Sequence, residues 1–185
     1  DRNGDGVVDD NDRDIIGNPN PDFTYGFQTK VSWKSLSLSA SFNGVQGRDI
    51  LNVGNRYNNT PGTKSNNVTR KAFQNMWTDE NPSNLYPKST FVVQNMVMDR
   101  YVEDGSYLRC SDITLSYVLP AKWTNKIGIK NTSVYASVKN AFVITDYSGY
   151  DPEVNSFAFD GLRPGVDMNS YPTPRSFVFG LNLTF

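Results

Sequence analysis

SFVFGLNLTF, residues 176–185, alternates almost without exception between the two faces expected of a β-strand. One face carries Phe177, Phe179, Leu181, Leu183 and Phe185. The other face carries mostly small or polar residues, so the strand has one side for an apolar environment and one for water. Three phenylalanines on the apolar face, the last of them ending the sequence, favour a closing strand of an outer-membrane barrel over half of a soluble sandwich.

The same alternation occurs in four more runs, and a series of such runs is stronger evidence than one. The expected strands are about 23–33, 36–44, 107–119, 134–144 and 176–185. Each has roughly the ten residues that a tilted strand needs to cross a bilayer. The run at 134–144 is the least regular, because Asn140 interrupts its apolar face.

The connections between these runs differ in length. Lys34 and Ser35 form a tight hairpin and residues 120–131 a modest turn, whereas 45–105 and 146–174 are long loops. A soluble antiparallel sheet with one buried face gives the same alternation. However, short turns on one side and long loops on the other are typical of membrane barrels, and a compact soluble domain rarely holds a connection of some sixty residues. We therefore predict an all-β fold of five antiparallel transmembrane strands.

Five strands cannot close a barrel, because the smallest known barrels have eight. An open sheet in lipid would leave two rows of backbone groups unpaired. The sequence also shows no signal peptide, which an outer-membrane protein requires. We therefore expect additional chain to complete the wall.

Composition excludes several classes of function. The net charge of −1 gives no nucleic-acid signal, and without histidine there are no imidazole bases, Ser-His-Asp triads or common zinc sites. Cys110 has no disulfide partner, and we expect it to be structural and on the lumen side of its strand. Lys30, Arg109 and Lys139 are expected on lumen faces, in contact with channel water.

DRNGDGVVDDND, residues 1–12, is close to the calcium-loop template of spaced oxygen ligands around a glycine. The candidate calcium ligands are Asp1, Asn3, Asp5, the Val7 carbonyl, Asp9 and Asp12. Gly6 would permit the sharp reversal that lets these oxygens converge. The alternative is a solvated acidic turn, which the same composition also favours.

Longer blocks of the sequence carry a family resemblance. The blocks are DRNGDGVVDDNDRDIIGNPNPDFTYGF, FNGVQGRDILN, WTDENPSNLYPKS, VEDGSYLRCSDITLSYVLP and DYSGYDPEV, followed by the terminal phenylalanine. In this order they resemble the C-terminal portion of SusC-like (SusC/RagA family) TonB-dependent outer-membrane receptors, over essentially the whole chain.

The resemblance implies a 22-stranded barrel of the Bacteroidetes outer membrane, of which these would be the last five strands. Such receptors import oligosaccharides and sometimes peptides with energy transmitted through TonB. A SusD-like surface lipoprotein covers their extracellular mouth, and their plug domain and TonB box lie far upstream of the blocks found here.

The family topology also implies a direction for each strand. It places residues 1–22 and the two long loops outside the cell. It places Trp33, Tyr117 and Phe185, with Trp123 beside them, at the periplasmic interface, where aromatic girdles lie.

We expect the outer loops to bind the ligand and the lipoprotein. The candidates for stacking on sugar rings, which could equally fill the loop core, are Tyr147, Tyr150, Phe157 and Phe159. Residues 67–77 are expected to form a short helix that packs Val68, Phe73 and Trp77.

Other functions are compatible with parts of the sequence. One is a secreted β-sandwich that binds carbohydrate and uses the acidic loop as a calcium staple. A dockerin would pair two such loops, and only one is present. Asp151 with Glu153 offers the two carboxylates of a glycosidase, but they lie in a block shared with the receptors, so we expect no enzyme.

Overall fold

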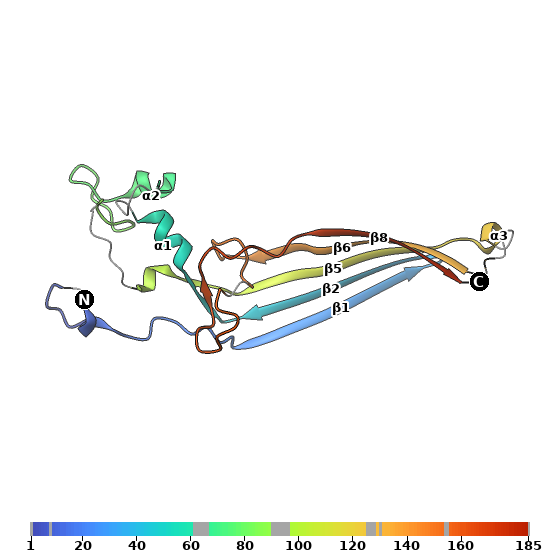
Figure 1. Ribbon diagram of the computed structural model, residues 1–185, viewed down its shortest axis with the longest axis horizontal. Coiled ribbons are helices and arrows are strands. Elements are labelled where there is room, and N and C mark those ends of the chain that lie inside the picture. Colours follow the sequence, from blue (N-terminus) through green and yellow to red (C-terminus); the bar gives the residue numbers. More distant parts are fainter. Residues whose placement is uncertain are drawn as a thin grey trace.

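Five long strands form a single antiparallel sheet in the computed structural model, which describes residues 2–7, 9–60, 67–89, 97–124, 129, 131–153 and 156–184. The strands are β1 (Phe23–Trp33), β2 (Leu36–Gln46), β5 (Tyr107–Val118), β6 (Asn131–Thr145) and β8 (Ser176–Thr184). Their spatial order, β1-β2-β5-β6-β8, follows the chain, and Figure 1 shows them side by side along the long axis. The sheet is therefore a meander with two open edges, β1 and β8.

The strands extend beyond the ranges expected from alternation in two places. β2 continues to Gln46, which pairs with Phe23, and β6 begins at Asn131, which pairs with Thr184. Backbone pairing does not require an apolar side chain, so these polar ends continue the ladder without continuing the pattern. Phe185 lies outside the described residues.

A second, smaller sheet lies at one end of the long strands, which we call the loop end (Figure 1). It consists of β4 (Val102–Asp104), β3 (Asp49–Asn52) and β7 (Val166–Asp167), with β3 antiparallel to β4 and parallel to β7. Short helices accompany it, namely η1 (Asp10–Asp12), α1 (Val53–Asn59), α2 (Arg70–Asn75) and η2 (Asp99–Tyr101). The sequence predicted only loops for the residues of β3, β4 and β7.

The opposite end, which we call the turn end, holds the Lys34–Ser35 hairpin and α3 (Ala121–Thr124). Trp33 and Tyr117 lie in the last rows of the ladder there, both paired with Leu36. Trp123 in α3 is exposed at the same end. In the described part of the chain, no helix has both the length and the apolar character needed to cross a membrane.

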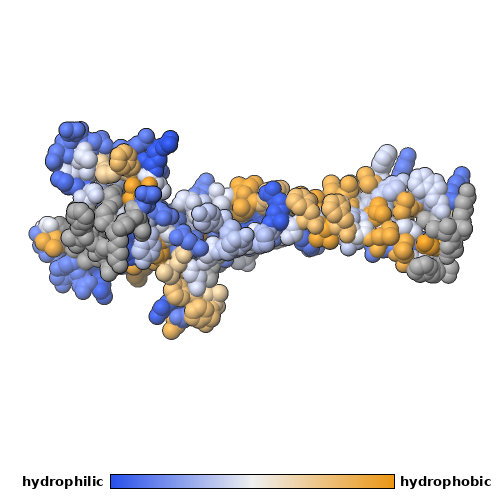
Figure 2. All heavy atoms as spheres, turned by 45° about the horizontal axis from the view of Figure 1, so that its top comes forward, coloured by the Kyte–Doolittle hydropathy of each residue, from blue (hydrophilic) through white to orange (hydrophobic). Residues whose placement is uncertain are grey.

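The wall formed by the five long strands is one layer thick. Large apolar side chains remain open on one face, for example Phe179 at 79% exposure and Trp33 at 68%. By contrast, most of the buried hydrophobic residues lie at the loop end, including Ile50, Tyr107 and Tyr147. Figure 2 shows apolar residues gathered over the strands and hydrophilic ones around the helices at the loop end.

A β-bulge in β5 changes which side chains share a face. Ser41 and Phe42, adjacent in β2, pair with Asp112 and Cys110, so Ser111 has no counterpart in β2. Because one extra residue reverses the alternation, Cys110 lies on the apolar face, paired with Phe42 and with Phe142 of β6. The prediction that Cys110 faces the lumen side was wrong, since the residue is fully buried on the apolar face.

Candidate functional site: the wall and its loop end

The apolar face of the wall carries rows of side chains that run across the strands. Phe27, Phe42, Cys110 and Phe142 form one such row. The rings of Phe27 and Phe42 stack with centroids 4.5 Å apart, and Phe142 meets Phe42 edge-on at 6.3 Å. Such a surface is costly in water at about 25 cal/mol per Å² of apolar area, whereas lipid matches it.

The polar face of the wall is rich in hydroxyl groups. Ser32 and Ser37 face each other across the hairpin at 2.8 Å. Asp112 accepts hydrogen bonds from Thr114 and Ser137, each at 2.7 Å, and lies 3.1 Å from the ammonium of Lys139. Lys139 is therefore ion-paired and not merely wetted, although its side chain stays 55% exposed.

Where the polar face reaches the loop end, Arg109 is enclosed by carboxylates. Its guanidinium pairs with Asp151 and, through Nε at 2.7 Å, with Glu153. Glu153 also accepts hydrogen bonds from the Tyr107 hydroxyl and from the Asn43 amide. We call these five residues the Arg109 cluster; it fastens the 146–175 loop to β2 and β5.

Arg109 and Asp151 are both almost fully buried, with 4% and 3% exposure. Burial raises the pKa of the Asp151 carboxyl, but backbone N–H groups of Glu153 and Thr173 and the charge of Arg109 outweigh it. The pKa of Asp151 is therefore lowered from its ordinary value. The carboxylate is held ionised by groups from three parts of the chain.

A second group of polar contacts joins the small sheet to the loops. Glu103 of β4 accepts hydrogen bonds from Asn52 and Asn55, and from both the backbone and the hydroxyl of Ser148. Tyr147 donates to Asp167 at 2.7 Å, and both residues are buried. Burial and the hydrogen bond to the Asp167 carboxylate raise the pKa of Tyr147.

The sequence and the structure were both compared with known proteins. No family model matches the chain. A TonB-dependent receptor of Formosa agariphila is 34% identical over 193 residues, which covers 100% of this chain and 19% of that receptor. The TonB-dependent receptor SusC of Bacteroides thetaiotaomicron is 34% identical over 192 residues, covering 100% of this chain and 17% of SusC.

Solved structures agree. The RagAB peptide transporter superposes with a TM-score of 0.78 and 29% identity, over 92% of this chain and 18% of that one. The RagAB peptide importer in its open-open state superposes with a TM-score of 0.73 and 29% identity, over 90% of this chain and 17% of that one. The chain belongs to the SusC/RagA family of TonB-dependent receptors.

Its five strands are accordingly part of a large transmembrane β-barrel of the outer membrane, as the alternation predicted. The chain spans less than a fifth of the length of the relatives it matches. In this SusC/RagA-type wall the apolar face meets lipid and the polar face meets the lumen.

In the described part of the acidic loop, the carboxylates accept hydrogen bonds from the loop's own backbone. Asp12 accepts from the backbone of Arg2 and Asp9, Asp5 accepts from Val7, and Asp9 accepts from Asn11. Among the described residues, no three acidic side chains form a group that could hold a metal ion. Asp1 lies outside the described residues, and calcium binding stays a prediction.

Gly4 and Gly6 have φ of +76° and +84°, a backbone region that favours glycine. Gly6 therefore makes a reversal of the kind expected from the sequence. Backbone hydrogen bonds from Asp9 and Arg2 lower the pKa of Asp12.

The aromatic candidates of the outer loop differ in exposure. Tyr147 is buried against Asp167, so it does not present its ring to a ligand. Tyr150 and Phe159 are 73% and 88% exposed. Phe157 lies beneath the guanidinium of Arg163, 5.4 Å from its ring centroid.

The expected helix at 67–77 is the shorter α2, and it buries Ala72. Phe73 is 66% exposed, so the predicted packing of Phe73 was wrong.

The two carboxylates considered for glycoside hydrolysis both bind Arg109. That arrangement ties them into a structural cluster, and the relatives are receptors and transporters. The sequence did not predict the roles of Arg109, Glu103 or Asp167, because their partners lie tens of residues away. The only available signal was a charged residue inside an otherwise alternating strand.

Proposed function

We propose that the chain forms part of the wall and mouth of an importer that takes up oligosaccharides or peptides across the outer membrane. The observation that carries this proposal is a wall with one open apolar face, one hydroxyl-rich face and a small sheet at one end. The curated relative SusC and the solved RagAB transporter, named for peptide transport, support it.

The partners follow from the same kinship. We propose that the rest of the barrel and a plug complete the channel, that TonB supplies the energy, and that a SusD-like lipoprotein covers the loop end. Exposed aromatic and aliphatic residues of the 146–175 loop offer it an apolar contact, since Phe159, Leu162 and Tyr171 are each at least 86% exposed. No catalytic role is proposed for any residue.

A soluble carbohydrate-binding sandwich is less well supported. A sandwich needs a second sheet over the apolar face of the first, about 10 Å away. Among the described residues, the second sheet packs at the loop end and leaves that face open (Figure 1).

Purification of the full-length receptor from its own outer membranes in detergent would test the importer. We expect it to co-purify with a surface lipoprotein, and mass spectrometry of the complex should find oligosaccharides or peptides released on denaturation. A receptor that is recovered from the soluble fraction, folded without detergent, would contradict the proposal.

Calcium at the acidic loop is proposed separately, on its spacing of oxygen ligands and the two positive-φ glycines. Protease sensitivity of this loop should rise on addition of a chelator and fall again when calcium is restored. Unchanged cleavage under both conditions would count against the site.

A further inference from the structure

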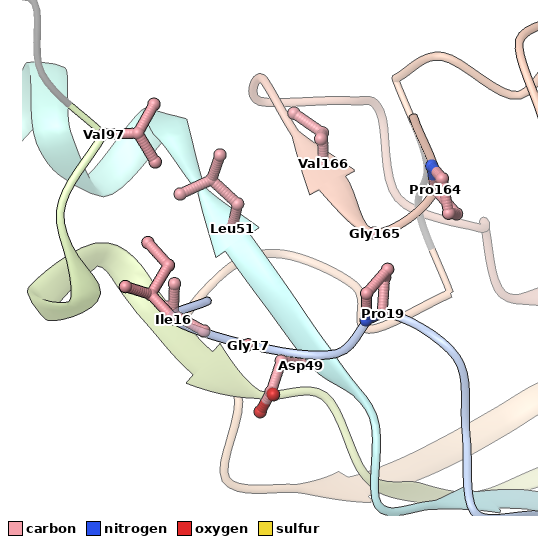
Figure 3. Close-up of a pocket in the computed structure, with 10 residues that line it drawn as sticks. Ile16, Gly17, Pro19, Asp49, Leu51, Val97, Pro164, Gly165 and Val166 are labelled. Atoms are coloured by element: carbon pink, nitrogen blue, oxygen red, sulfur yellow. The ribbon is translucent and has the colours of Figure 1, made fainter. Parts of the chain in front are cut away.

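An apolar pocket of about 190 Å³ opens at the loop end (Figure 3). Leu51 of β3 and Val166 of β7 line one part of the pocket. Val102 of β4 and Val97, which precedes β4, line another part. Ile16 and Pro19 close another side, from the extended segment that leads into β1. The pocket is roomy enough for an apolar side chain.

The segment at 14–20 is held in place by the small sheet. The backbone N–H of Asn18 donates to the Asp49 carboxylate at 2.7 Å, and the Asp49 N–H donates to the Asn18 carbonyl at 2.8 Å. A side chain at Gly17 would lie only 3.0 Å from Val102. The rim that this segment gives the pocket is thus fixed by hydrogen bonds and close packing.

The chain closes on itself just before this segment. The backbone N–H of Arg2 donates to Asp12 at 2.7 Å, and its guanidinium pairs with Asp14 at 2.5 Å. Arg2, the first described residue, therefore lies next to Asp14. We call residues 2–13 the acidic turn. The leaving arm is residues 14–22, and the entering arm is the chain that would lead into the turn. The contacts of Arg2 bring these two arms together at the acidic turn.

The other end of that arm is fixed by the barrel. Every long strand pairs with its neighbours in sequence, so the strand before β1 is expected on the open edge of β1. Paired strands lie about 4.8 Å apart. The two arms are therefore expected next to each other at Phe23 and at the acidic turn, and the pocket lies along the leaving arm between these two points.

We propose that the arm entering the acidic turn runs antiparallel to residues 14–20 and places an apolar side chain in this pocket. The exposed surface there needs such a cover, since Ile15 is 90% and Val97 58% exposed. The pocket is in this way a latch that holds the two arms of one outer loop on the small sheet.

Site-specific photo-cross-linking in the full-length receptor, in native outer membranes, tests the latch. A benzoyl-phenylalanine placed at Ile15 or at Val97 should cross-link within the chain to one peptide that directly precedes residue 1. The same probe at Leu162, which is 92% exposed on another loop, should not reach that peptide. Cross-links to a separate polypeptide, to other parts of this chain, or to nothing would overturn the proposal.

Filling the pocket gives an independent readout. Leu51→Trp should expel the arm and increase its cleavage by added protease about fivefold or more, since an overpacked site loses about 1–3 kcal/mol. Leu162→Trp is the matched control and should leave the cleavage rate unchanged. Equal cleavage of both variants and the parent receptor would contradict the latch.

Discussion

Along the wall each side chain is assigned to lipid or to water, whereas at the loop end side chains are buried against one another. Phe27 and Phe42 need only an apolar surrounding, and any apolar residue of similar size would serve there. Arg109 needs Asp151 and Glu153, which come from a loop some forty residues away. The wall thus depends on pattern, and the loop end depends on particular pairs.

The largest effect is expected when one member of such a pair is removed. Arg109→Met leaves the buried Asp151 carboxylate without its cation, a change that costs about 3–5 kcal/mol. Hydrogen exchange in the full-length receptor should show lost protection of the 146–175 loop. Adding Asp151→Asn should restore much of this protection. Lys139→Met breaks a pair whose lysine is 55% exposed and should cost at most about 1 kcal/mol. Equal effects of Arg109→Met and Lys139→Met would remove the contrast between the two regions.

A charge on the lipid face tests the wall itself. Ala40 and Ser39 are adjacent in β2 and point to opposite faces. Ala40→Arg should destabilise the barrel by about 2–4 kcal/mol, because its row lies near the middle of the strands. Ser39→Arg is the control and should cost much less, as measured by urea unfolding of the receptor in lipid. Similar losses for both variants would mean that the faces are wrongly assigned.

A smaller effect is expected from a single hydroxyl at the loop end. Tyr147→Phe removes the donor to the buried Asp167 carboxylate and should cost about 1–3 kcal/mol. Exchange of the amides around β7 should accelerate while the wall stays protected. If protection at β7 does not change, this bond does not hold the loop.

Acid should have the smallest effect over most of the pH range, because the lowered pKa keeps the Asp151 carboxyl ionised until the pH is strongly acidic. The pKa of Asp151 is lower in the folded protein than in the unfolded chain. The ionised carboxylate therefore adds its full contribution to folding stability above about pH 4. That contribution is lost as the pH falls through the folded pKa. Protease resistance of the 146–175 loop should follow this curve, and Asp151→Asn should flatten it. Loss of resistance between pH 7 and 5 would point to another group.

The sequence predicted the wall because alternation is a local signal, readable from neighbouring residues such as Phe177 and Phe179. It failed at Ser111, where the bulge moves Cys110 to the other face, since nothing in the local pattern marks an unpaired residue. The small sheet was missed for a related reason. β7 has two residues and β4 has three, too few for any periodicity to appear.

The candidate site shows the same division. Gly6 was correctly expected to make a reversal, because a glycine among acidic residues is a local signal. The partners of Arg109 and Glu103 were not predicted, since contacts between residues so distant in sequence depend on how the loops fold back. Calcium binding by the acidic loop is still to be tested.

We assign successive side chains of each long strand alternately to lipid and to the lumen. Single cysteines at Leu38, Ser39, Ala40 and Ser41, placed in the full-length receptor with Cys110→Ala, can be labelled with a fluorophore in bilayers that contain brominated lipid. We predict strong quenching at Leu38 and Ala40 and little at Ser39 and Ser41. Equal quenching at all four positions, or the reverse alternation, would contradict this assignment of the two faces.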